Sequence, residues 1–166
     1  MNFDVVKQLV AYGREQEKLH DKHFRFTLTT NGVLLNDDIM EFANKEMDNV
    51  VLSIDGRKEV NDRMRPFRKG AGSYDLIVPK FQKLAESRNQ ERYYVRGTYT
   101  HFNTDFSKDV LHADWHDVWH SPHPPVLIVF CNFLVFNVFT CFMRISPLSV
   151  FSDFPSICVI IAQQAP

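Results

Sequence analysis

Length, composition and charge limit what this chain can be. At 166 residues it is long enough for one ordinary domain with a sizeable core, and too short for a complete eight-stranded α/β barrel of typical size. Its formal net charge of −1 gives no electrostatic reason to bind nucleic acid or an anionic membrane surface, and no signal peptide follows Met1, so we expect a cytoplasmic protein without a nucleic-acid partner.

Composition divides the chain into two unlike parts. Residues 113–166 contain no Lys, no Glu and no Gly, yet they hold all three cysteines and both tryptophans. Lys, Glu and Gly are among the commonest residues of globular proteins. We therefore treat residues 1–112 and 113–166 separately.

The first part begins with alternating helix and strand patterns. Helical spacing of apolar residues predicts helices over residues 3–18 and 37–47, the second with Asn36 as its N-cap. Alternation of apolar and polar residues predicts a strand over residues 24–29. The short apolar run at residues 50–54 is typical of a strand that is buried on both faces.

The same pattern continues to the end of this part. We expect a charged loop over residues 56–72, then a third helix capped by Ser73 with Leu76 on its apolar side. A third strand is predicted over residues 93–100, and a fourth helix from Thr104 or Asp105. Strands that alternate with helices predict an α/β fold with a parallel sheet and right-handed crossovers.

Small polar residues and a glycine follow the first two predicted strands. Thr29-Thr30-Asn31-Gly32 follows one, and Ser53-Ile54-Asp55-Gly56 follows the other. In α/β proteins, ligands bind at the carboxyl ends of parallel strands. These two stretches are therefore the first candidates for a functional site.

Five segments within residues 1 to about 112 stand out by their order and spacing. They are Thr29-Thr30-Asn31-Gly32-Val33-Leu34-Leu35, Ser53-Ile54-Asp55-Gly56, Asn61-Asp62-Arg63-Met64-Arg65, Gly70-Ala71-Gly72-Ser73-Tyr74-Asp75 and Arg96-Gly97-Thr98-Tyr99-Thr100. With these segments, residues 1 to about 112 resemble the middle of a radical S-adenosylmethionine (SAM) enzyme of the SPASM type, and most closely the maturases that form thioether cross-links in SCIFF peptides. No single tetrapeptide carries the resemblance, which depends on the order and spacing of all five segments.

The resemblance implies a fragment of a partial (β/α)6 TIM-like barrel, with SAM and a [4Fe-4S] cluster as cofactors of the parent enzyme and a cysteine-rich precursor peptide as its partner. The family holds its cluster with a CxxxCxxC loop and meets SAM with a GGEP-type motif, and this sequence contains neither. We therefore expect Met1 to be an internal methionine of a longer parent, and this chain by itself to be inactive.

The resemblance also implies site residues. Ser53 and Arg65 match positions that contact SAM in relatives, while Asn31 and Asp55 lie at equivalent strand ends and Arg96 faces the same side as Thr98. Hydroxyl and guanidinium groups suit the carboxylate and ribose of a zwitterionic sulfonium ligand. The alternatives are that Ser53 ends a strand, that Arg65 is a solvated loop cation, and that Arg96 is a structural residue lining the barrel.

Two other groups of side chains could bind a ligand. The Arg and Lys residues between positions 57 and 69 suggest phosphate or nucleic-acid binding, but interleaved acidic residues favour an ordinary charged loop. His112, His116 and His120 would share one helix face and suggest zinc, although nearby prolines break helices and no ordering partner is visible. We predict no metal site from the sequence.

The last part stops resembling the family. Residues 126–143 have the length and hydropathy of a transmembrane helix. Our main hypothesis is a frameshifted or mispredicted tail over residues 113–166; the alternative is a genuine tail on a membrane-anchored interaction module. A nucleotide-binding α/β domain without radical chemistry is a third interpretation, but no G-x-G-x-x-G or P-loop pattern supports it.

Overall fold

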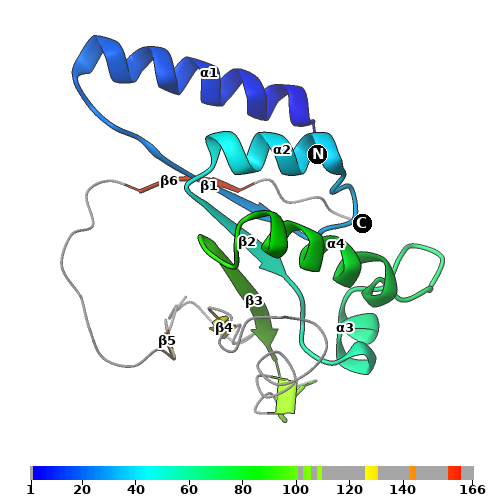
Figure 1. Cartoon of the computed structure of the whole chain (residues 1–166). Helices are drawn as coiled ribbons and strands as arrows, with labels where there is room; N and C mark the ends of the chain where they lie inside the picture. The colour runs from blue at the N-terminus through cyan, green and yellow to red at the C-terminus, as the bar shows by residue number, and fades with distance from the viewer. Residues whose placement is uncertain are drawn as a thin grey trace.

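The computed structural model describes residues 2–100 (except the side chain of Tyr99), 103–105 and 108–109, together with the backbone of three later strands. Over residues 3–99 the helices and strands follow the predicted order, with one additional short helix over residues 58–64 (Figure 1). In chain order the elements are α1 (Phe3–His20), β1 (Arg25–Thr30), α2 (Asp37–Glu46), β2 (Asn49–Ser53), α3 (Lys58–Met64), α4 (Tyr74–Ser87), β3 (Tyr93–Tyr99), β4 (Val126–Phe130), β5 (Met143–Arg144) and β6 (Ile157–Ile161).

The strands form one sheet in the order β5-β4-β3-β2-β1-β6. The strands β1, β2 and β3 run parallel, with Thr29 opposite Val51 and Ser53 opposite Arg96. The helices α1, α2 and α4 lie on one side of these three strands (Figure 1). The predicted α/β class and the parallel sheet are therefore confirmed, and the carboxyl ends of β1, β2 and β3 lie at one edge of the sheet.

The hydrophobic core lies between the three strands and the covering helices. Leu28 of β1, Val50 and Leu52 of β2, and Phe81 of α4 are fully buried. Tyr93 of β3 is also fully buried; burial raises the pKa of this phenol to about 12, and its hydroxyl donates to Gln90 Oε1 at 2.8 Å. Such packing of helices on one face of a sheet holds the strand ends in place.

Two local predictions about helix starts had different outcomes. The Asn36 side chain accepts a hydrogen bond from the Ile39 N–H at 2.9 Å, which confirms it as the cap of α2. Ser73 precedes α4, but its side chain makes no capping bond. Instead the Tyr74 N–H donates to Asp62 Oδ1 at 2.8 Å, so a carboxylate from α3 satisfies the start of α4.

The predicted charged loop over residues 56–72 was wrong in part, because it contains the helix α3. Only Val60 and Asn61 of this seven-residue helix are buried, so its sequence has no apolar periodicity from which a helix could be predicted. In α4, Leu76 was expected on the buried side and is 43% exposed. Ile77 and Phe81 make the buried face there.

Most of what was predicted for residues 101–166 falls on residues that the structure does not describe. In the predicted fourth helix, Lys108 and Asp109 are helical, and the neighbouring positions lie outside the described residues. Val126–Phe130, inside the predicted transmembrane segment, is the strand β4, parallel to β3. Most of the remainder of residues 126–143 and the three histidines lie outside the described residues. Within the described part of the chain, no helix combines the length and apolar character needed to cross a bilayer.

Candidate functional site at the strand ends

An ion pair between Asp55 and Arg65 stands at the carboxyl end of β2. Arg65 Nε donates to Asp55 Oδ2 at 2.7 Å, and Arg65 Nη2 donates to Asp55 Oδ1 at 3.0 Å. The Asp55 side chain is 4% exposed and that of Arg65 is 25% exposed. Two parallel N–H···O bonds fix the plane of the guanidinium as well as its position. Arg65 is therefore not the fully solvated loop cation of the alternative interpretation.

The same carboxylate also joins β2 to β3. Asp55 Oδ1 accepts a hydrogen bond from the Thr98 N–H at 2.8 Å, and the Ile54 N–H donates to the Arg96 carbonyl at 2.9 Å. Asp55 thus receives donors from β3 and from the end of α3. These contacts hold two strand ends and one helix end together.

Ser53 and Arg96 lie next to each other across the two strands. They are partners in the parallel register, and Ser53 is 2% exposed while Arg96 is half-buried. Because neighbouring positions of a parallel pair face the same side of the sheet, the two side chains share a face. The structure therefore brings together four of the five predicted site residues: Ser53, Asp55, Arg65 and Arg96.

Asn31, the fifth predicted residue, lies in a separate turn after β1. Its Oδ1 accepts from the Val33 N–H at 3.3 Å, and Thr30 Oγ1 accepts from the Gly32 N–H at 3.1 Å. Gly32 has φ +77° and packs so closely on Phe81 that a Cβ would lie 2.4 Å from its ring. Only glycine fits that turn without strain. Asn31 is thus positioned by its own loop.

Two buried polar residues behind the ion pair were not predicted as site residues. Asn61 of α3 is fully buried, and its Oδ1 accepts from the Asp55 N–H at 3.2 Å. Its Nδ2 donates to Ser73 Oγ at 3.1 Å, and that hydroxyl donates to the Arg65 carbonyl at 2.8 Å. The sequence gives no direct signal for this set, because the contacts join three elements that are separated along the chain.

A second charged cluster, also missed, fixes the chain after Asp55. Gly56 has φ +80°, and a Cβ there would lie 2.2 Å from Asp109. Arg57 Nε donates to Asp109 Oδ1 at 2.7 Å and Nη2 donates to Asp105 Oδ2 at 2.8 Å. Hydrogen bonds with Asp109 and Asp105 raise the pKa of Arg57, and the bond from Arg57 lowers the pKa of Asp105. The four-residue spacing of Asp105 and Asp109 is the only sequence signal for this charged cluster.

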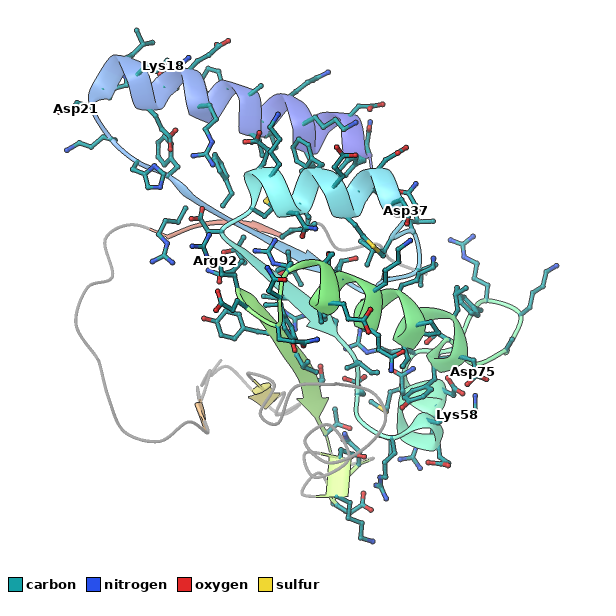
Figure 2. All side chains as sticks on the ribbon, viewed as in Figure 1. Lys18, Asp21, Asp37, Lys58, Asp75 and Arg92 are labelled. Atoms are coloured by element: carbon teal, nitrogen blue, oxygen red, sulfur yellow. The ribbon has the colours of Figure 1, made fainter. Side chains whose placement is uncertain are left out.

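Asp62 links the outer side of this region to α4. Burial raises its pKa, but the Tyr74 N–H and the ammonium group of Lys58 lower it more, so the carboxyl titrates below its ordinary value. Lys58 also pairs with Asp75, and Figure 2 shows this pair on the outer side of α3 and α4. Among residues 2–100 and the short described stretches after them, no group of three His, Cys, Asp or Glu side chains could hold a metal ion.

Comparison with known proteins shows which known architecture the fold of this chain has. No protein-family model matches the chain, and no curated protein matches its sequence. Native anSMEcpe with bound AdoMet and the Kp18Cys peptide superposes with a TM-score of 0.58 at 18% identity, over 79% of this chain and 34% of that chain. The fold is that of part of a radical SAM barrel. The name anSMEcpe denotes an anaerobic sulfatase-maturating radical SAM enzyme.

Two further structures of this radical SAM enzyme agree. Native anSMEcpe with bound AdoMet has a TM-score of 0.58 at 18% identity, over 78% of this chain and 34% of that chain. The complex with AdoMet and the Cp18Cys peptide has a TM-score of 0.57 at 20% identity, over 77% and 34%. The chain therefore spans about one third of the length of these structures. The resemblance to the radical SAM family is confirmed for the fold of the described residues.

Proposed function

We propose that this chain supplies part of the SAM-binding surface of a radical SAM peptide-modifying maturase. One observation carries the proposal: Arg65 pairs with Asp55 just beyond the end of β2, and Ser53 and Arg96 are register partners at the neighbouring ends of β2 and β3. The radical SAM structures with the same fold have AdoMet bound, and two of them also have a peptide bound. A ligand site at the carboxyl ends of parallel strands also agrees with α/β folds in general.

The donor groups suit the chemistry of SAM. A guanidinium has five N–H groups, and the Asp55 carboxylate takes two of those of Arg65. The other three N–H groups can donate to the SAM carboxylate. The hydroxyl of Ser53 and the side chains of Arg96 and Asn31 add hydrogen-bonding groups for the other polar atoms of SAM. Asp55 already accepts three hydrogen bonds, so its role in the site is to orient Arg65.

The residues present do not fit the iron-sulfur cluster. The three cysteines, at positions 131, 141 and 158, lack the CxxxCxxC spacing. When bound in a protein that has such a loop, a [4Fe-4S] cluster supplies the electron for reductive cleavage of SAM. We propose that thioether formation on a cysteine-rich precursor peptide is carried out by a protein that has such a loop. We also propose that this chain alone is inactive.

Calorimetric titration of the full chain with SAM tests the proposal. We expect saturable binding, and a loss of about tenfold in affinity for Arg65→Met, the size expected from one charged hydrogen-bonding group. Ser53→Ala should also weaken binding, by a smaller factor. Lys69→Met is the matched control, because Lys69 is an exposed cation of the following loop. Absence of saturable binding by the unchanged chain, or an equal loss in the control, would contradict the proposal.

A spectroscopic experiment tests the inactive state separately. After incubation of the full chain with iron and sulfide under anaerobic conditions, we expect no charge-transfer absorbance of a [4Fe-4S] cluster. Stoichiometric cluster assembly would overturn the proposal that this chain lacks the ligands of the cluster. SAM binding without cluster assembly is the combined result that we expect.

A further inference from the structure

The geometry points to Asn61 and Ser73 as positioning residues that hold the Asp55–Arg65 pair from behind. Both side chains are buried, Asn61 at 0% and Ser73 at 4% exposure. The Ser73 hydroxyl does not make the capping bond that its place before α4 would suggest. Their polar groups instead reach the main chain on each side of the ion pair.

The hydrogen bonds form a chain with one consistent direction. The Asp55 N–H donates to Asn61 Oδ1, Asn61 Nδ2 donates to Ser73 Oγ, and the Ser73 hydroxyl donates to the Arg65 carbonyl. The amide of Asn61 cannot be turned round, because Nδ2 would then face the Asp55 N–H and two donors would meet. The side chains of Asn61 and Ser73 therefore connect the backbone of Asp55 to the backbone of Arg65.

This connection fixes both ends of the pair independently of the pair itself. Arg65 ends α3, with its N–H bonded to the Asn61 carbonyl at 2.7 Å and its own carbonyl bonded to Ser73. Asp55 is held through its N–H and through the bond from Thr98. With both backbones fixed, the guanidinium meets the carboxylate in one orientation, and its three other N–H groups point in a fixed direction. That these groups serve SAM depends on the proposed function.

Exchange of the Arg65 Nε–H with water, measured by NMR on the ligand-free full chain, tests the positioning role without SAM. Arg65→Lys removes the signal and so assigns it. We expect slow exchange in the unchanged chain and an acceleration of about tenfold in Ser73→Ala, as for the loss of one buried hydrogen bond. Ser73→Thr keeps the hydroxyl and should restore slow exchange. Ser87→Ala is the matched control, because it removes a hydroxyl at the exposed end of the same helix.

If Ser73→Ala does not fold, Ser73→Cys provides the second variant, because a thiol is a similar but weaker donor and should give an intermediate acceleration. Unchanged exchange in either folded variant would overturn the positioning role. The affinity for SAM is then compared, and we expect about a tenfold loss in Ser73→Ala and recovery in Ser73→Thr. Faster exchange with unchanged affinity would overturn the link to the ligand. Failure of the unchanged chain to bind SAM would count against the proposed function alone.

Discussion

The ends of β1 and β2 look alike in the sequence and are held in different ways. After β1, the turn at Asn31 is built from bonds within its own loop, and Lys80 Nζ of α4 donates to the Val33 carbonyl at 2.7 Å. After β2, a buried carboxylate at Asp55 receives donors from β3 and from the end of α3. One end is fixed by main-chain geometry and packing, the other by buried charge.

This difference predicts how each end responds to change. A local turn tolerates the loss of one polar group, because water can replace it at the surface. A buried carboxylate that accepts three hydrogen bonds is harder to replace, because its removal leaves several donors at a mostly buried site without an acceptor. Substitutions after β2 should therefore cost more than polar substitutions after β1, and the following predictions run from the largest expected effect to the smallest.

Removal of the Asp55 carboxylate should have the largest effect. Asp55→Ala leaves the Arg65 guanidinium and the Thr98 N–H without their acceptor, and we expect a loss of roughly 3–5 kcal/mol in the free energy of unfolding, as for a broken buried ion pair. Urea unfolding measures it. Asp37→Ala is the control, because the pair of Asp37 with Lys83 is exposed. Similar losses in the two variants would contradict the distinction between the strand ends.

Replacement of Gly32 should show that the end of β1 is sensitive to shape. Gly32→Ala puts a side chain into a left-handed turn and against Phe81, so we expect a loss of roughly 1–3 kcal/mol, the range for strained backbone positions. Gly70→Ala has the same kind of φ, +82°, but nothing lies within 4 Å of its Cβ. The difference between the two urea midpoints isolates the packing on Phe81. Equal midpoints would mean that this packing contributes nothing.

Loss of the α2 cap should have a smaller effect. Asn36→Ala removes the acceptor of the Ile39 N–H, and we expect a loss of about 1 kcal/mol in the free energy of unfolding. Asn44→Ala is the control, because this exposed amide of the same helix bonds the Ser87 hydroxyl. A loss in Asn36→Ala no greater than in the control would show that the cap does not stabilise the loop after β1.

The pH dependence of stability should be the smallest of these effects. The pKa of Asp62 is lowered in the folded state, so its contribution is complete above the ordinary value of 3.8 and is lost as pH falls through the lowered value. Glu17, held by the Phe24 N–H and Arg14, behaves in the same way relative to 4.5. Thermal unfolding between pH 2 and pH 6, a range that spans about two units on each side of pH 4, measures this loss. Asp62→Asn should flatten the acid limb; an unchanged limb would contradict the assignment.

Much of the fold and part of the site could be predicted from the sequence. The strands β1, β2 and β3 and the helices α1, α2 and α4 follow from apolar periodicity, and the strand-end residues Ser53 and Asp55 follow from the parallel order. The helix α3 could not be predicted because only Val60 and Asn61 face inward. The role of Ser73 depends on a carbonyl eight residues earlier, and that of Arg57 on carboxylates about fifty residues later. Such partners are set by packing and leave no periodic pattern.

The most direct test of the central claim is an NMR titration of the isotope-labelled full chain with SAM. The account predicts saturable chemical-shift changes at the backbone amides of Ser53 and Thr98 and at the Arg65 Nε–H, with smaller changes at Asn31. The amides along the middle of α1, on the far side of the core, should not move. Absence of saturable changes at the strand ends, or changes confined to the outer helices, would contradict the claim that these strand ends form a SAM site.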